Sequence, residues 1–461
     1  MRLVSVALVV VTAACGSSPR PTVPTVKPTG DAAGAHRAAV ASLVQPLIDA
    51  EITTGIVVGL YDAGKTEIYG FGKGPDGQAP TGTTLFELGA VTQIYTNLLF
   101  ADAIQRRVVT LDTGLAELLP PGVTAPASPG ARVTLGSLAT NTAGFPRLPP
   151  SLGQRMNPQD PYASYGEDRL YADLIGTQLL AAPGTALLAS NYGEGVLGFV
   201  LGKKIGGGFA NALTLRVLAP LGLASTFLTV PPIAKARRAV GTDLDLKPVP
   251  NWTWDALASA GGLVSSTADQ LALIDAELDA ASGSKQPLRA AMRLSQEEQL
   301  PGRGSQNVGL GWQIDGIGRY WHNGGTGGFR SFVGFDPKTR RGIVILSSSA
   351  VSLVDHIALD LYKLLANEQV TPVKPPSVDQ LAPYVGTYQL GEFKLVVSIK
   401  DKRMYITGQG EQAMRLIPLS DHEMWFEEQQ AIVVFEKDGD KVARAVFVIG
   451  PQRLAAPRVA D

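Results

Sequence analysis

Cysteine is almost absent from this sequence, which has only Cys15 among 461 residues. A single cysteine excludes an internal disulfide. Histidine is also scarce, because the chain has four, and they lie far apart without the spacing of metal ligands. We therefore expect neither a bound metal nor another cofactor.

Charge of either sign is also limited. Charged residues make up 18% of the chain, and 40 basic residues nearly balance 41 acidic ones. A nucleic-acid-binding protein typically carries a basic patch or stripe, and none is visible, so we expect no nucleic-acid partner. The 45% hydrophobic content is typical of a globular protein, and the length suffices for one large core or two smaller ones.

The apolar run at residues 3–11 is too short to span a bilayer. It reads instead as an export signal, and the small residues that end it stand directly before Cys15. This pattern resembles a bacterial lipobox, in which the cysteine is acylated. An ordinary cleavage site with an incidental cysteine is the alternative. We predict a lipoprotein signal peptide (residues 1–15), a proline-rich tether (16–35) and a lipid-anchored protein of the bacterial cell envelope.

In residues 86–104 a strand-like end and a glycine lead into a helix, which is predicted to lie deep in the core. Val91, Ile94, Leu98 and Ala101 recur at helical spacing, and further apolar residues occupy the neighbouring faces. The start of such a helix favours developing negative charge, so it is a place where a hydrolase could hold a nucleophile.

Other elements are predicted around this helix. The pattern indicates an amphipathic helix at residues 40–48, a hairpin turning at 62–65, a helix capped by Ser266, strands within 307–349 and a helix at 353–366. After a proline-rich linker (370–379), seven short β-prone runs predict an all-β domain at 380–461.

The buried helix carries a family resemblance. Its frame is similar to the nucleophile element of serine β-lactamases and penicillin-binding proteins of the class C-like branch, which reads F-x-x-G-S-V-T-K-x-x-T-x-x-L. The residues that match are Phe86, Gly89, Val91, Thr92, Thr96 and Leu99. In this frame Ala90 stands at the serine position and Gln93 at the lysine position.

Later segments resemble the other motifs of this family. Ser190 and Asn191 keep their places in Y-S-N-x-G, whereas Ala189 occupies the tyrosine position. His322-Asn323-Gly324 corresponds to the strand motif H-x-G, and Asn141 replaces the histidine of a loop motif. The resemblance implies an α+β fold of the β-lactamase/transpeptidase type, an antiparallel sheet plus a helical lobe, over residues 36–369. The all-β tail is similar to the lipocalin-like domain often joined to such hydrolases.

The resemblance also implies a mechanism whose reacting groups are missing. In the family a serine attacks a carbonyl, a lysine one turn later activates it, a tyrosine moves protons and backbone N–H groups stabilise the oxyanion. Ala90, Gln93 and Ala189 cannot do this, so we assign no catalytic residue. We predict a pseudoenzyme whose cleft keeps Asn191 and the 322–324 strand for a peptidoglycan peptide, a β-lactam-like or acyl compound, or a protein segment.

Two alternatives stay open. The chain could be an active β-lactamase, esterase or D-Ala peptidase with another nucleophile, or the β tail could be the functional part. Thr92 should point to a different helix face from position 90. Ser282 and Lys285 match Ser-x-x-Lys only formally, because they lie in a Gly/Ser loop without a helix to align them. His322 could act as a base, but the sequence assigns it no serine partner.

Overall fold

The structure is a computed structural model that describes residues 34–152, 157–280, 286–300, 307–370, 372, 374–410, 412–449 and 451–459. The predicted signal peptide with Cys15, nearly all of the tether, and the Ser282–Lys285 match lie outside the described residues. In the part of the chain that is described, no helix is long and apolar enough to cross a membrane.

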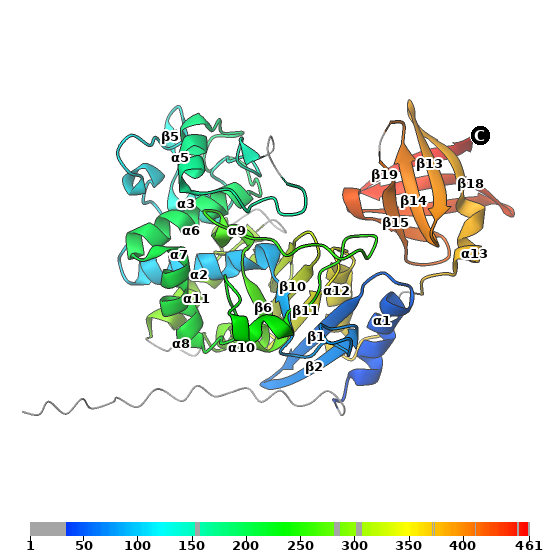
Figure 1. Cartoon of the computed structure of the whole chain (residues 1–461), viewed down its shortest axis with the longest axis horizontal. Coiled ribbons are helices and arrows are strands. Elements are labelled where there is room, and N and C mark those ends of the chain that lie inside the picture. Colours follow the sequence, from blue (N-terminus) through cyan, green and yellow to red (C-terminus); the bar gives the residue numbers. More distant parts are fainter. Residues whose placement is uncertain are drawn as a thin grey trace, which may run out of the picture.

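A seven-stranded antiparallel sheet is built from both ends of the β-lactamase-like region (Figure 1). The predicted hairpin forms β1 and β2, and β1 pairs with the last strand, β11. In spatial order the strands are β2 (Lys65–Gly72), β1 (Gly55–Asp62), β11 (Arg341–Ser347), β10 (Arg330–Asp336), β9 (Tyr320–Gly325), β8 (Gln313–Ile314) and β7 (Asn307–Val308).

Both faces of this sheet are covered by helices. α1 (Arg37–Asp49) and α12 (Val354–Leu365) pack on one face, in a cluster with Ile56 of β1. Val57, the next residue, joins the larger cluster of the helical lobe on the other face. Because strand side chains alternate between faces, a strand covered on both sides must be apolar at nearly every position, as β1 is.

The helical lobe lies between the two sheet-forming segments of the chain. Its helices are α2 (Thr92–Gln105), α3 (Leu135–Ala139), α5 (Glu167–Gly176), α6 (Asn191–Ile205), α7 (Gly208–Leu213), α8 (Ala219–Leu221), α9 (Ala258–Gly261), α10 (Thr267–Asp279) and α11 (Pro287–Gln296). Two short ladders accompany them, β3 (Leu85–Glu87) with β6 (Val264–Ser266) and β4 (Ala127–Ser128) with β5 (Ala131–Arg132).

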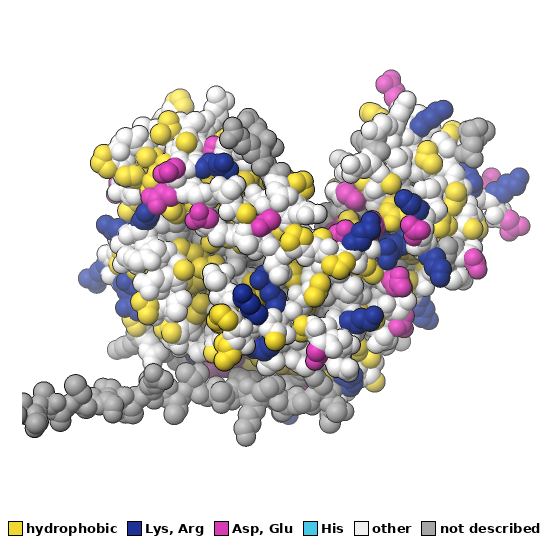
Figure 2. Space-filling model, in the orientation of Figure 1, with side chains coloured by type: hydrophobic (Ala, Val, Ile, Leu, Met, Phe, Trp, Pro, Cys, Tyr) yellow, Lys and Arg dark blue, Asp and Glu magenta, His cyan; other side chains and the backbone are white. Residues whose placement is uncertain are grey.

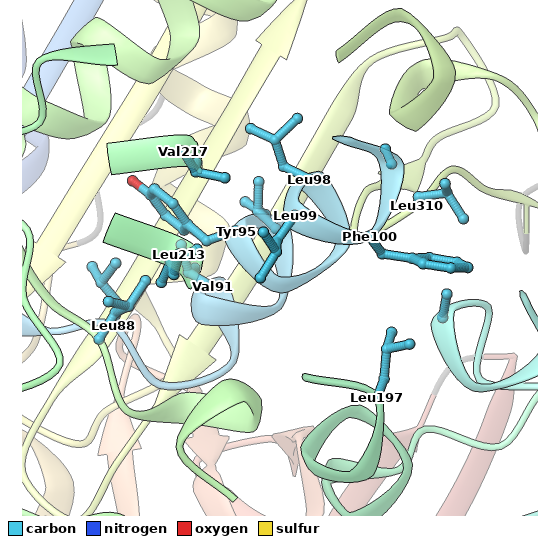
Figure 3. Packing of buried hydrophobic residues seen from close by; sticks show 14 of the residues in the cluster. Leu88, Val91, Tyr95, Leu98, Leu99, Phe100, Leu197, Leu213, Val217 and Leu310 are labelled. Carbon is cyan, nitrogen blue, oxygen red and sulfur yellow. The ribbon is translucent and has the colours of Figure 1, made fainter. Parts of the chain in front are cut away.

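The predicted core helix is confirmed as α2. Every residue from Thr92 to Ala103 is buried. Figure 3 shows Tyr95, Leu98, Leu99 and Phe100 pointing to several sides of the helix, toward neighbours from other elements. A short 3-10 turn, η1 (Gly89–Val91), joins β3 to α2, and position 90 lies in that turn.

The C-terminal region is a closed eight-stranded barrel. Its strands are β12 (Gly386–Leu390), β13 (Phe393–Lys400), β14 (Arg403–Gly408), β15 (Met414–Pro418), β16 (Glu423–Phe426), β17 (Ala431–Asp438), β18 (Lys441–Ile449) and β19 (Gln452–Val459), preceded by α13 (Val378–Leu381). The all-β fold is confirmed, but the seven predicted runs missed β19. Its polar residues and Pro457 do not give a strand signal.

The barrel lies beside the β-lactamase-like region (Figure 1), and its residues Ile417 and Trp425 belong to the same apolar cluster as α1 and α12. Trp425 of β16 lies in the same apolar cluster as these helices, with its ring centroid 4.8 Å from that of His356. Its Nε1 donates to Ser352 Oγ at 3.2 Å. Elsewhere, Arg403 donates to the backbone oxygen of Asp245 at 2.6 Å. The domain limits predicted at 370 and 379 remain predictions.

Charged side chains are scattered over the face shown in Figure 2, where basic and acidic groups alternate without a continuous patch of either sign. This distribution fits the near balance of 40 basic and 41 acidic residues. The same view shows a notch between the helical lobe and the barrel.

Candidate functional site

A cavity of about 330 Å³ brings together six of the seven predicted site residues. It lies where the start of α2, the start of α6 and strand β9 meet. The six residues that line it are Ala90, Gln93, Ala189, Asn191, His322 and Asn323. Three segments that are far apart in the sequence therefore converge at this cavity.

Glycines allow β9 to approach position 90. A Cβ on Gly324 would stand 2.1 Å from the oxygen of Leu88 and 2.7 Å from the nitrogen of Ala90, so a larger residue would displace the backbone. Gly89 has a φ of +51°, and a Cβ there would stand 2.6 Å from the nitrogen and oxygen of Gly325. Gly324 therefore lies against the backbone of Leu88 and Ala90, and it is not one of the residues that line the cavity.

Gln93 holds a fixed position in the cavity. Its Nε2 donates to the oxygen of Ala260 at 3.3 Å and to Asn191 Oδ1 at 3.4 Å. Gln93 and Asn191 are therefore in contact. A side-chain amide neither gains nor loses a proton near neutral pH. Gln93 can therefore orient a neighbour but cannot act as a base toward it.

The second motif is held by backbone hydrogen bonds. Ser190 caps α6, because its Oγ accepts from the nitrogen of Gly193 at 2.8 Å and donates to the oxygen of Pro146 at 2.7 Å. Asn141, which has a φ of +56°, accepts from the Ser190 nitrogen at 2.8 Å. Asn141 thus positions the segment that presents Ala189 and Asn191 to the cavity.

No hydroxyl that lines the cavity in the described chain is paired with a base. Ser190 is occupied as described, and Thr140 Oγ1 donates to the oxygen of Gly136 at 2.9 Å. Thr92 turns away as predicted, since its Oγ1 accepts from the nitrogen of Leu263 at 3.1 Å. A hydroxyl needs an adjacent base to become a nucleophile, and these hydroxyls have backbone partners instead.

The third motif presents His322 to the cavity. Its Nδ1 lies 2.7 Å from the oxygen of Asn323, and because a carbonyl only accepts, this bond places the proton on Nδ1. Burial lowers the pKa of His322, so the ring is neutral near pH 7. The Asn323 amide instead donates to Asp355 of α12 at 2.5 Å, which leaves mainly its backbone at the cavity.

Two ionisable residues of the cavity were not singled out from the sequence. Glu194 is 1% exposed, and its Oε2 accepts from Asn97 Nδ2 at 3.0 Å. Burial raises the pKa of this carboxyl well above its ordinary value. Arg147 is exposed and also lines the cavity. The available signal was the spacing of Glu194, three residues after Asn191 on one helix face.

Residues 40–368 match the Beta-lactamase family. The chain is 26% identical to a beta-lactamase of Pseudomonas fluorescens, over 68% of this chain and 93% of that protein. It is 29% identical to a beta-lactamase of Escherichia coli, with coverages of 66% and 86%. It is 24% identical to the E. coli D-alanyl-D-alanine-carboxypeptidase/endopeptidase AmpH, over 64% of this chain and 79% of that protein.

The fold is similar to that of a solved class C beta-lactamase mutant. The TM-score is 0.62 at 22% identity, and the match covers 72% of this chain and 97% of that one. At 22% identity this similarity is evidence for the fold alone. It agrees with the sheet and helical lobe described above.

Proposed function

Because the chain belongs to the Beta-lactamase family, we propose that it is a non-catalytic member that binds its ligand in the cavity without forming a covalent bond. The observation that carries this proposal is the chemistry at the start of α2. A methyl group stands at position 90 and a hydrogen-bonded amide at position 93, and both line the cavity. Neither can attack a carbonyl or activate a neighbour.

The other groups at the cavity support the same proposal. Ala189 offers no proton at the tyrosine position, and the hydroxyls of Ser190 and Thr140 donate to backbone oxygens. His322 keeps an Nε2 lone pair, but among the described residues no hydroxyl that lines the cavity is paired with it. Loss of the nucleophile in a serine hydrolase costs about a million-fold in turnover, and backbone donors alone retain about a thousand-fold over water.

The ligand we propose is a peptidoglycan stem peptide or a related acyl or β-lactam-like compound. Relatives support this chemistry, because one is named a penicillin-binding protein and another a D-alanyl-D-alanine-carboxypeptidase/endopeptidase. The cavity of about 330 Å³ is at the lower end of ligand pockets, which favours a small ligand or the end of a longer one.

Intact-mass measurement tests the proposal. Incubation with a fluorescent penicillin and with a fluorophosphonate should leave the mass unchanged, and a chromogenic cephalosporin should be hydrolysed at close to the buffer rate. The control is the triple variant Ala90→Ser, Gln93→Lys, Ala189→Tyr, alongside its three single variants. Only the triple variant should gain activity, because such residues act as a unit. A stoichiometric adduct on a wild-type Ser or Thr of the cavity would overturn the proposal.

We also propose that the protein is anchored in the bacterial cell envelope through acylated Cys15. The export signal and the proline-rich tether support this, since two acyl chains suffice for stable attachment. Wild-type protein should incorporate labelled palmitate, and Cys15→Ala should be released or left unprocessed. A wild-type protein that never takes up the label would refute the anchor.

A further inference from the structure

The cavity contains a carboxyl group that the protein satisfies only in part. Glu194 lines it, is 1% exposed and accepts one hydrogen bond, from Asn97 Nδ2 to Oε2 at 3.0 Å. No hydrogen bond to its other oxygen is found within the described residues. A carboxyl buried this deeply usually has a charged partner or several donors, because the ionised form loses its hydration.

No cation of the described chain is paired with Glu194. Of the residues that line the cavity, only Arg147 and His322 also carry titratable groups, and His322 is neutral. Arg147 is exposed and makes no ion pair with Glu194 in the described structure. Helices α2, α3, α7 and α9 pack against α6, and the charged residue among them is Asp102. Helix α5 also contacts α6, and none of its charged residues, Glu167, Asp168, Arg169 and Asp173, is paired with Glu194 in the described structure. The Asp102 carboxylate is paired with Arg106 and Arg216.

We propose that the cavity takes a small zwitterion, an amino acid or short peptide, whose ammonium group binds Glu194 and whose carboxylate binds Arg147 at the entrance. The inference rests on the proposed non-covalent function and names its ligand class. Gln93 is uncharged, so it cannot serve as a cationic partner for Glu194 in the cavity. In this proposal the ligand's ammonium group supplies the positive charge.

The position of Glu194 suits the binding of an ammonium group. It lies in the first turn of α6, where the helix dipole favours a carboxylate. Burial raises the pKa of the Glu194 carboxyl well above its ordinary value, which favours the protonated form when no cation is bound. An ammonium within hydrogen-bond distance favours the ionised form. Binding therefore favours loss of the Glu194 proton to solvent, while the ligand amine keeps its own proton.

Calorimetry with D-alanyl-D-alanine and its N-acetyl derivative tests the inference. Wild-type protein should bind the free dipeptide at least tenfold more tightly than the acetylated one. Titrations in buffers of different ionisation enthalpy should show that binding of the free dipeptide releases protons. Glu194→Gln should lose both the preference and the proton release, whereas Glu194→Asp should keep a reduced preference. Glu392→Gln makes the same chemical change at an exposed turn of the barrel and should behave as wild type.

Thermal unfolding confirms that each variant is folded before titration. Equal binding of the two dipeptides, unchanged binding by Glu194→Gln, or no binding of either dipeptide by wild type would overturn the inference. A penicillin adduct on the wild-type protein would instead overturn the non-covalent function. The dipeptide titration measures reversible binding at Glu194, whereas the penicillin experiment measures covalent adduct formation. Failure of the inference and failure of the proposed function are therefore distinguishable.

Discussion

Glu277→Gln should make the protein more stable in alkaline solution. Glu277 of α10 is 1% exposed, and Gln296 Nε2 donates to its Oε2 at 2.6 Å. No partner of Oε1 is found among the described residues. Burial is the largest cause that raises the pKa of Glu277, to about 8. The folded protein therefore holds this carboxyl in its neutral form across most of the physiological range.

The sign of the effect follows from comparing the folded and unfolded states. An unfolded glutamate has a pKa of about 4.3, so between that value and about 8 the folded state binds more protons. The stabilising contribution is complete below about pH 4 and is lost as pH rises through 8. At about 1.4 kcal/mol per pKa unit, the loss amounts to several kcal/mol at pH 9. Glutamine cannot ionise, so the variant avoids this loss.

Chemical or thermal unfolding at pH 5, 7 and 9 measures the effect. Glu277→Gln should be within about 1 kcal/mol of wild type at pH 5, because the amide keeps an acceptor for Gln296. Its advantage should grow steadily to pH 9. Glu297→Gln, an exposed change on a neighbouring segment, is the control and should follow wild type at each pH. If the curves of wild type and Glu277→Gln run parallel from pH 5 to 9, the reasoning from burial is wrong.

Two further predictions concern packing. Gly324→Ala should lower stability by about 1–3 kcal/mol and distort the cavity, because its Cβ would meet the Leu88 oxygen. The control Gly316→Ala places its Cβ in open space and should leave thermal unfolding nearly unchanged. Cleavage within the predicted linker (370–379) should leave wild-type fragments associated, and Trp425→Ala should let them separate on gel filtration because a buried anchor is lost. Unchanged melting of Gly324→Ala, or co-eluting Trp425→Ala fragments, would contradict these expectations.

Local patterns in the sequence gave reliable predictions of single elements. The hairpin at 55–72 was visible because its turn separates two β-prone runs. The cap at Ser266 was visible because a hydroxyl precedes an apolar helical run, and Ser266 Oγ indeed accepts from the nitrogen of Asp269 at 3.3 Å. Such signals depend on neighbours within a few residues, so they can be recognised without the fold.

The convergence of the site came from family resemblance and not from local patterns. Nothing in the spacing of Ala90, Asn191 and His322 shows that α2, α6 and β9 meet. Glu194 was missed because an acidic residue in a helix is usually solvated. The direction of the Asn323 side chain depends on α12, which covers the far face of the sheet. There the Asn323 amide donates a hydrogen bond to Asp355. The docking of Trp425 likewise depends on two surfaces that are distant in sequence.

The pairing of β1 with β11 has a consequence for how the chain is made. Thr53 and Ser347, 294 positions apart, share a hydrogen bond of 2.8 Å, and the ladder that follows joins an early strand to a late one. Contacts of such long range form slowly, and an early strand without its partner leaves open edges that invite aggregation. The sheet can close only after synthesis has passed residue 347, so a ribosome that stops earlier releases a chain with no route to this fold.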